Sequence, residues 1–263
     1  MATRTRGKSE EGRMSFGAHL IELRNRLFRA ALAIVVASVV GYFLVPFVLD
    51  ALQVPLKQIS ESTGRTAVLN NTRLTEAFDV QLQITVILGI VISSPVWLYQ
   101  IWAYIVPALK RTEKRYAAGF LGATIPLFLA GCATGWFIFP HTVELLAGFA
   151  PDDSTSIFGT KDFVDFVSRL VLAVGIGFVL PVFLVLLNFI GVLSAASILK
   201  GWRIAVLAIT LFSALATPPS DVMTMFLLAI PMLMLYLLAA GVAWLHDRAA
   251  ARKLRSLIEE STI

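Results

Sequence analysis

Long apolar runs constrain this chain more than any other feature of its sequence. The first run covers residues 28–49, and its length of about 22 residues lets a helix cross a hydrocarbon core of ~30 Å. Apolar residues make up 57% of the chain and charged residues only 15%, too few to surround a soluble core. The sequence therefore predicts an all-α, polytopic membrane protein and excludes soluble enzyme classes. The other runs are residues 78–99, 116–139, 163–190, 204–216 and 222–244.

These six runs predict six transmembrane helices in one membrane domain, residues 28–245. The fifth run has only about thirteen residues, or about 20 Å as a helix, and ends at a Thr-Pro-Pro sequence. A proline pair cannot continue a helix, so we expect a short fifth helix that forms a hairpin with the sixth. Residues 1–27 are predicted to be a cytoplasmic N-terminal region with an interfacial amphipathic helix, and residues 246–263 a cytoplasmic tail.

Two longer loops are expected on the opposite side of the membrane. They cover residues 50–77 and 140–162, are too long for simple hairpins, and carry several apolar side chains. We expect these two long loops to form a small cap on the far side.

The basic residues predict which loops face the cytoplasm. Seventeen of the 22 Lys and Arg residues lie in residues 1–29, 110–115, 200–203 and 248–255. Four lie in the opposite segments, and Arg169 lies just inside the fourth run. Because cytoplasmic loops carry the excess of Lys and Arg, both termini are predicted to be cytoplasmic. The same rule explains the net charge of +5, so we expect no nucleic-acid partner.

The apolar runs carry no residue pattern that would support catalysis. They contain no paired carboxylates, no serine with a base and no set of metal ligands, and the chain has no glycine-rich nucleotide-binding motif. His141 and Glu144 could share a metal, but for two candidate ligands helix capping or solvation is the default interpretation. The lone Cys132 can close no disulfide within the chain. We expect no enzyme activity, no cofactor and no metal.

An amphipathic stretch before the first run carries Glu22. Its apolar residues recur at helical spacing, which predicts a helix in the membrane interface with Glu22 displayed to the cytoplasm. Glu22 and Arg26 also have the i, i+4 spacing of a helical ion pair worth only ~0.3–0.5 kcal/mol. Spacing alone leaves both interpretations open. The apolar residues of the stripe are Phe16, Leu20, Leu23 and Leu27.

Glu113 is the only acidic residue in residues 107–115, among four basic ones. One interpretation is that Glu113 only forms a local charge pair with Lys110 or Lys114, and the other is that it binds a ligand. Two carboxylates on one cytoplasmic surface could receive two guanidinium groups through bidentate bonds, which lysine fits poorly. Partial exclusion of water near the lipid would strengthen such pairing. Glu22 and Glu113 are therefore the candidate binding residues for a pair of arginines.

Several short motifs, taken in order, give the chain a specific family resemblance. They are HLIELR at 19–24, TEAF at 75–78, PVWLYQIWAYIVPAL at 95–109, GVLS at 191–194, TPP at 217–219 and LLAIP at 227–231. Each motif alone would be weak, but their joint occurrence is highly specific. The chain resembles the TatC family of the twin-arginine translocase over nearly its whole length after about residue 15.

The resemblance implies the core receptor of a system that exports folded proteins across a bacterial-type cytoplasmic membrane by using the proton-motive force. Its substrates carry two consecutive arginines in an N-terminal signal peptide. It further implies a six-helix, cupped shape with short fifth and sixth helices. Its partners would be single-span TatA- and TatB-type subunits in an oligomeric complex. The signal-peptide-binding positions carried over from the family are Glu22, Glu113, Arg24, His19, Leu20, Tyr104 and Gln100.

Other positions carried over from the family concern the cap and the docking of partners. Pro55 matches a proline that the family needs, and we interpret it as fixing a turn in the cap. The predicted partner-docking residues are Gln81, Asp221, Thr224 and Met225. The alternative to partner docking for Gln81 and its neighbour Gln83 is hydrogen bonding between helices of this chain. The alternative for Asp221 is an N-cap role.

The chain also departs from the family pattern. Val179 stands where many members carry Glu or Gln, so the buried carboxylate site of the fourth helix is not carried over. Met225 and Leu237 stand where polar residues are frequent, and Tyr104 stands where Phe is common.

Two other functions stay open on the residues alone. A secondary transporter of small solutes would need a midplane site made by broken helices and paired ionisable groups. An intramembrane hydrolase would need an acid or a serine inside a helix, and the apolar runs offer few such groups.

Overall fold

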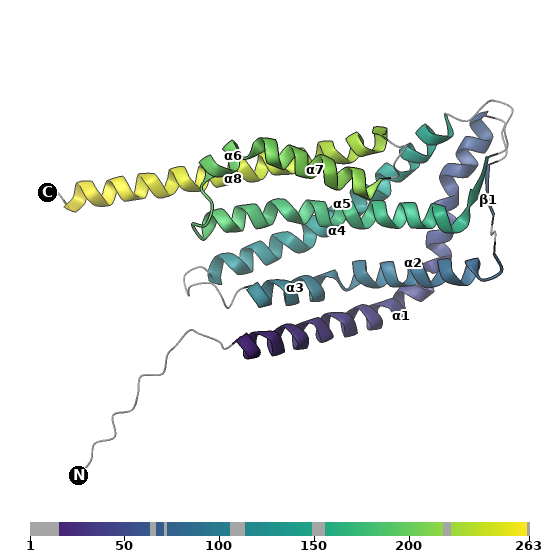
Figure 1. Ribbon diagram of the computed structural model, residues 1–263, viewed down its shortest axis with the longest axis horizontal. Coiled ribbons are helices and arrows are strands. Elements are labelled where there is room, and N and C mark those ends of the chain that lie inside the picture. The colour runs from purple at the N-terminus through teal and green to yellow at the C-terminus, as the bar shows by residue number, and fades with distance from the viewer. Residues whose placement is uncertain are drawn as a thin grey trace, which may run out of the picture.

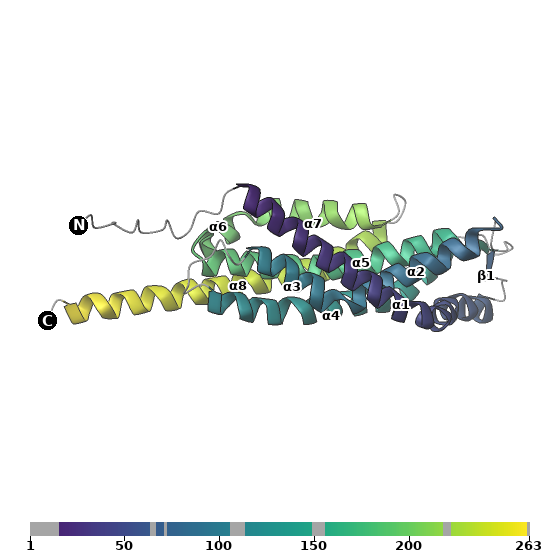
Figure 2. The same cartoon turned by 90° about the horizontal axis from the view of Figure 1, so that it is seen from below.

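The structure is a computed structural model that describes residues 16–63, 67–70, 73–105, 114–148, 156–217 and 222–261. Helices make up nearly all of these residues. The long helices lie side by side (Figure 1), and the view from below shows that the bundle is thin in that direction (Figure 2). In chain order the elements are α1 (Phe16–Thr63), β1 (Ala67–Asn70), α2 (Glu76–Ile92), α3 (Ser94–Ile105), α4 (Lys114–Ala147), β2 (Ser156–Gly159), α5 (Thr160–Phe189), α6 (Ala195–Lys200), α7 (Trp202–Ala216) and α8 (Val222–Ser261).

The lengths of the helices confirm the all-α, polytopic membrane fold. Within the described part of the chain, α1, α4, α5 and α8 are each long and apolar enough to cross a membrane. The pair α2 and α3 passes the same test only together, because the two helices are bent by 58°. The 15-residue α7 is shorter than a full crossing, as the thirteen-residue run predicts. The number of six crossings stays a prediction.

The last helix differs from the short sixth helix that the resemblance implies. α8 has 40 residues and continues without a break through most of the predicted tail, beyond the other helices (Figure 1). The cause is local, because residues 247–261 contain neither Gly nor Pro and are rich in the strong helix formers Ala, Arg, Glu and Leu.

The bend between α2 and α3 follows from a Ser-Ser-Pro sequence. Pro95 has no N–H, and its ring clashes with the carbonyl four residues earlier, so a straight helix cannot continue. The hydroxyl of Ser93 donates to the carbonyl of Gly89 at 2.6 Å, a second bond to a carbonyl that also accepts the backbone N–H of Ser93. Trp97 Nε1 donates to the carbonyl of Ile90 at 2.9 Å, across the bend. These bonds hold α3 at a fixed angle to α2.

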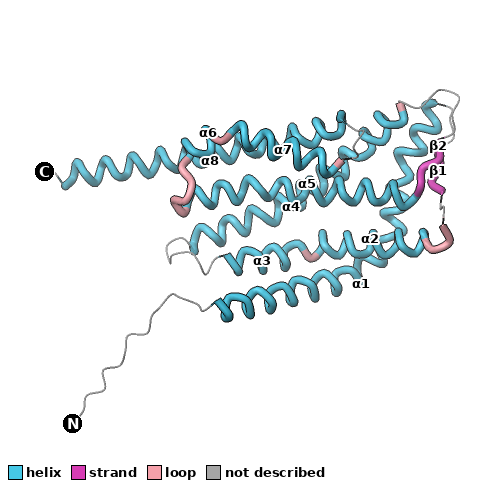
Figure 3. Tube along the Cα trace, in the orientation of Figure 1, coloured by secondary structure: helices cyan, strands magenta, loops and turns pink. Residues whose placement is uncertain are grey.

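The predicted far-side cap is mostly helical rather than made of loops. α1 continues to Thr63 and turns across this end of the bundle (Figure 1), and α4 continues to Ala147. The strands β1 and β2 pair in parallel, with Ala67 opposite Ser156 (Figure 3). Pro55 is buried inside α1, so it does not form the turn that we expected. Prolines within a helix bend it without ending it where neighbouring segments satisfy the freed carbonyls.

A buried carboxylate ties the starts of α2 and α5 together at the capped end. Glu76, only 4% exposed, accepts the backbone N–H of Lys161 at 3.0 Å and that of Arg73 at 3.1 Å. The first N–H groups of a helix have no partner within that helix, and its positive end favours an anion. Glu76 therefore caps α5 from a different element.

Glycines allow α4 and α5 to pack closely in the middle of the bundle. A Cβ atom added to Gly131 would lie 2.8 Å from the Cα of Gly175 and 2.8 Å from the carbonyl oxygen of Val174. A Cβ on Gly135 would lie 2.9 Å from the Cα of Val171. These two glycines of α4 are four residues apart, the spacing that lets helix backbones approach each other in membranes.

Candidate functional site

Two of the predicted signal-binding residues meet where the start of α1 lies beside the end of α3. The ring of His19 stacks on that of Tyr104, with centroids 4.5 Å apart and an angle of 22° between the planes. Figure 1 places the start of α1 and the end of α3 at the same end of the bundle, opposite the strands. The tertiary fold therefore joins two motifs that are far apart in the sequence.

Glu22 is half paired. Its Oε1 accepts two hydrogen bonds from Arg26, from Nε at 2.9 Å and from Nη2 at 2.6 Å, and both side chains are 20% exposed. Its Oε2 is shielded from solvent and has no hydrogen-bond partner in the described structure. Leaving such an oxygen unpaired costs about 1–3 kcal/mol. The i, i+4 ion pair is therefore present, but it satisfies only one oxygen of the carboxylate.

α3 contributes two more shielded polar groups that lack partners among the described residues, Gln100 Oε1 and Trp102 Nε1. Trp102 is 1% exposed and stacks on Phe183 at a centroid distance of 4.9 Å, which fixes its ring. The sequence alone did not single out Trp102 as a candidate. The available signal is that a buried tryptophan needs a partner for its N–H.

Of the remaining signal-binding candidates, two lie within the described residues and one lies outside them. Leu20 is 48% exposed, and Arg24 is exposed with Nη2 3.5 Å from Asn25 Oδ1. Glu113 directly precedes α4 in the sequence but lies outside the described residues. The pairing of Glu22 with Glu113 therefore stays a prediction.

The predicted partner-docking residues lie on two elements. Gln81 is half-buried on α2, while the buried Thr224 and the half-buried Met225 lie at the start of α8. Asp221 lies outside the described residues. Gln83, the neighbour considered with Gln81, donates from Nε2 to Ser168 Oγ at 3.3 Å and so makes the helix-to-helix hydrogen bond that was its alternative.

Val179 lies in surroundings that do not favour a polar side chain. Val179 is buried in an apolar cluster with Leu98, Phe128 and Cys132, surroundings that would penalise a carboxylate. Around His141 and Glu144, as elsewhere in the described residues, no group of three or more His, Cys, Asp or Glu side chains could hold a metal ion.

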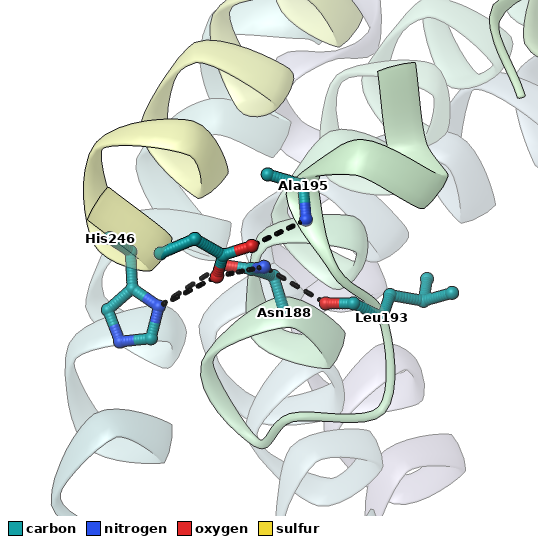
Figure 4. A network of polar contacts seen from close by, with 5 residues as sticks. Asn188, Leu193, Ala195 and His246 are labelled. Atoms are coloured by element: carbon teal, nitrogen blue, oxygen red, sulfur yellow. Dashed lines mark hydrogen bonds and ion pairs between the residues drawn. The ribbon is translucent and has the colours of Figure 1, made fainter. Parts of the chain in front are cut away.

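A polar network that was not predicted from the sequence joins α5, α6 and α8 (Figure 4). Asp247 accepts the backbone N–H of Ala195 at 2.7 Å and the side-chain N–H of Asn188 at 2.9 Å. Asn188 Nδ2 also donates to the carbonyl of Leu193 at 2.9 Å, and its Oδ1 lies 3.2 Å from Nδ1 of His246. The available signals were an asparagine inside the fourth apolar run and an acid just after the sixth.

The network sets the charge of Asp247, which follows the predicted membrane domain (residues 28–245). Burial alone would raise the pKa of its carboxyl group. The N–H donors of Ala195 and Asn188, together with the adjacent His246, outweigh burial and hold this pKa below its ordinary value of 3.8. Asp247 is therefore a charged, fully engaged acceptor, which suits a structural clamp.

Comparisons with known proteins agree with this architecture. The family described as Sec-independent protein translocase protein (TatC) matches residues 18–231. The chain is 42% identical over 241 residues to the Sec-independent protein translocase protein TatC of Xylanimonas cellulosilytica, covering 92% of this chain and 87% of that protein. It is 32% identical over 242 residues to the Sec-independent protein translocase protein TatCy of Bacillus subtilis, covering 91% of each.

Solved structures give the same answer. A crystal structure of the twin-arginine translocase receptor TatC in DDM superposes with a TM-score of 0.75 at 31% identity, over 86% of this chain and 99% of that one. A second crystal structure of the receptor gives a TM-score of 0.73 at 30% identity, over 86% and 98%. The chain therefore belongs to the TatC family of Sec-independent protein translocase proteins, membrane components of a protein transport system rather than enzymes.

Proposed function

We propose that this chain is the core receptor subunit of a twin-arginine translocase and binds the arginine pair of a signal peptide at the end of the bundle where α1 begins. The observation that carries the proposal is that Oε2 of Glu22 is shielded and has no hydrogen-bond partner among the described residues. A guanidinium group can give this oxygen an N–H donor and a positive charge. Arg26 already occupies Oε1, so a peptide arginine would bind Oε2.

Glu113 would bind the second arginine from the segment that joins α3 to α4. This segment directly follows α3, whose Tyr104 stacks on His19 three residues before Glu22. The chain connectivity therefore supports two carboxylates on one surface. Gln100 Oε1, unpaired within the described residues, is a further acceptor on the same helix.

The orientation and partners follow from the same proposal. The end that carries Glu22 would face the cytoplasm, together with both termini, because the segments there hold most of the Lys and Arg residues. Single-span TatA- and TatB-type subunits would assemble beside the bundle, with Gln81, Asp221, Thr224 and Met225 as docking residues. The proton-motive force would drive the export of folded proteins.

Site-specific photocross-linking tests the proposal. A twin-arginine signal peptide carries a photoreactive residue beside its arginine pair and is presented to the full chain in membranes. We expect cross-links near Glu22 and Glu113 that fall about tenfold or more in Glu22→Gln and in Glu113→Gln. The physical reason is that a hydrogen bond to a charged group contributes about 1.5–3 kcal/mol.

The matched control is Glu259→Gln, which removes an exposed acid from α8. This variant and the wild type should cross-link equally, and a twin-lysine peptide should label both weakly. Equal labelling by the twin-arginine and twin-lysine peptides, or full labelling of the Glu22→Gln, Glu113→Gln double variant, would refute the receptor function.

A further inference from the structure

A guanidinium group of the chain itself already lies on the carboxylate that the proposed function assigns to a peptide arginine. Arg26 donates to Oε1 of Glu22 from Nε at 2.9 Å and from Nη2 at 2.6 Å. Both bonds go to one oxygen, so the pair lacks the fork arrangement in which two parallel N–H groups meet two oxygens. Arg26 therefore occupies half of the carboxylate with the same chemical group that a signal-peptide arginine would bring.

The Glu22–Arg26 pair lies on the face of α1 that is turned towards α3. His19, Glu22 and Arg26 recur at spacings of three and four residues and so share one face of the helix. The stack of His19 on Tyr104 shows that this face meets the end of α3. Arg26 is accordingly only 20% exposed, whereas Arg29 is exposed and forms no ion pair within the described part of the chain. The pair is thus part of the proposed binding site.

A ligand can reach the free oxygen of Glu22 only after a neighbouring group moves. This oxygen, Oε2, is shielded from solvent and has no hydrogen-bond partner among the described residues. Arg26 is held to the carboxylate by an i, i+4 ion pair, a type of contact that contributes little to the stability of a helix. Displacing this side chain costs less than moving a packed core residue or the backbone. Movement of Arg26 is therefore the least costly way to open the carboxylate.

Charge favours replacement of Arg26 over sharing of the carboxylate. A peptide arginine that bound Oε2 beside Arg26 would place two guanidinium groups on one negative charge, and these groups repel each other. The exposed Arg24 and Arg29 of the same helix add to this repulsion. Once Arg26 leaves, the peptide arginine can use both oxygens of Glu22 through two parallel bonds. The exchange removes one positive charge from the carboxylate and completes the hydrogen bonding of Oε2.

We propose that Arg26 is an internal competitor of the signal peptide, bound to Glu22 in the empty receptor and displaced by a peptide arginine. This inference rests on the proposed function, because both concern the same carboxylate. Binding of the peptide is weakened by the fraction of receptors in which Arg26 holds Glu22. The same contact keeps the charge of Glu22 paired while no peptide is bound. Arg26 thus sets the affinity of the receptor and takes back the carboxylate when the peptide leaves.

A binding titration with matched variants tests the competition. A fluorescent twin-arginine signal peptide is titrated with the purified full chain in phosphatidylcholine nanodiscs, and fluorescence anisotropy gives the Kd. We expect Arg26→Gln to bind the peptide about threefold to tenfold more tightly than the wild type, because Glu22 is then free. The control Arg29→Gln removes the same charge from an exposed position of α1 and should change the Kd by less than about twofold.

A double-mutant cycle shows whether the effect acts through Glu22. In the Glu22→Gln background, Arg26→Gln should change the Kd no more than Arg29→Gln does. The burial of the Cys132 thiol, monitored with a thiol-reactive dye, checks the fold of every variant.

An unchanged or weaker affinity in a folded Arg26→Gln protein would overturn the competition. So would equally tighter binding in Arg29→Gln, or a gain from Arg26→Gln that persists without Glu22. Failure of the proposed function has a different signature. The wild type would then bind twin-arginine and twin-lysine peptides equally, and Glu22→Gln alone would not weaken the binding.

Discussion

Two carboxylates at the same end of the bundle have opposite hydrogen-bonding states. Asp247 accepts from Ala195 on one oxygen and from Asn188 on the other, so both oxygens are engaged by donors from other elements. Glu22 uses one oxygen for Arg26 of its own helix and leaves the other shielded and unpaired among the described residues. At the residue scale this difference separates a structural acid from one available to a ligand.

Asp247→Asn should lower the stability of the protein without affecting signal-peptide binding. The amide N–H₂ of the new side chain must face one of the two existing donors, so one hydrogen bond is lost. We expect the free energy of unfolding to fall by about 1–2 kcal/mol and the thermal midpoint to fall by a few degrees. The cost is at the low end for a charged acceptor because the side chain of Asp247 is 38% exposed. Exposure of the buried Cys132 thiol during heating reports unfolding.

Glu144→Gln, at an exposed position of α4, is the control and should unfold like the wild type. A normal midpoint for Asp247→Asn would show that the clamp carries no stability.

The lowered pKa of Asp247 also predicts a pH dependence. Because the folded state keeps this carboxyl group ionised below its ordinary pKa of 3.8, its contribution is complete above that pH and is lost as the pH falls through the lower, folded-state pKa. The difference in midpoint between the wild type and Asp247→Asn should therefore shrink in buffers more acidic than pH 3.8. A difference that grows below that pH would contradict this assignment of the charge.

At the element scale, close helix packing depends on where glycines face. Gly131 of α4 meets the backbone of α5, whereas a Cβ added to Gly122 of the same helix would meet nothing within 4 Å. The two positions therefore separate the effect of packing from that of helix propensity.

Gly131→Ala should destabilise the protein, while Gly122→Ala should be neutral or slightly stabilising. The new methyl group at 131 would lie 2.8 Å from two backbone atoms of α5, so the helices must move apart, at a typical cost of about 1–3 kcal/mol. At 122 the helix gains up to about 1 kcal/mol in propensity. Thermal unfolding followed through Cys132 compares them, and equal midpoints would show that α4 and α5 do not need this approach.

At the scale of the whole molecule, the two ends of the bundle have different tasks. One end carries Glu22, the stacked His19 and Tyr104, and the clamp at Asp247. The other end is closed by the pairing of β1 with β2 and by Glu76, which links the starts of α2 and α5. A substitution at the capped end should therefore leave the local stability of the binding end unchanged.

Glu76→Gln should loosen the capped end alone. A neutral amide keeps one acceptor oxygen for two backbone N–H groups and no longer complements the positive end of α5. We expect amide exchange in residues 67–70 and 156–161 to become about tenfold faster, with residues 16–27 unchanged, as measured by hydrogen exchange with mass spectrometry. Glu61→Gln, at an exposed position of α1, should leave the exchange of both ends as in the wild type. Faster exchange at both ends would indicate global destabilisation instead.

The sequence predicted the helical class, the positions of the apolar segments and the short α7, because hydrophobic length is a local property. It placed Glu22 on a helix, but in the structure this helix continues without a break into the apolar part of α1 and is not a separate interfacial helix. It did not predict the strands β1 and β2, since parallel pairing joins segments far apart in the chain. It also left the role of Gln83 open, because only the position of Ser168 decides which partner the amide finds.

Apolar length, charge placement and ordered motifs were enough to predict a membrane-spanning chain, its resemblance to the TatC family, and the acids that are candidates for an arginine pair. Helix packing was needed to show that His19 meets Tyr104, that one oxygen of Glu22 is unpaired among the described residues, and that Asp247 links α5, α6 and α8. The physical reason is that apolar length and charge placement act along the chain. Hydrogen-bond satisfaction, by contrast, depends on which groups the packed helices bring within about 3 Å of each other.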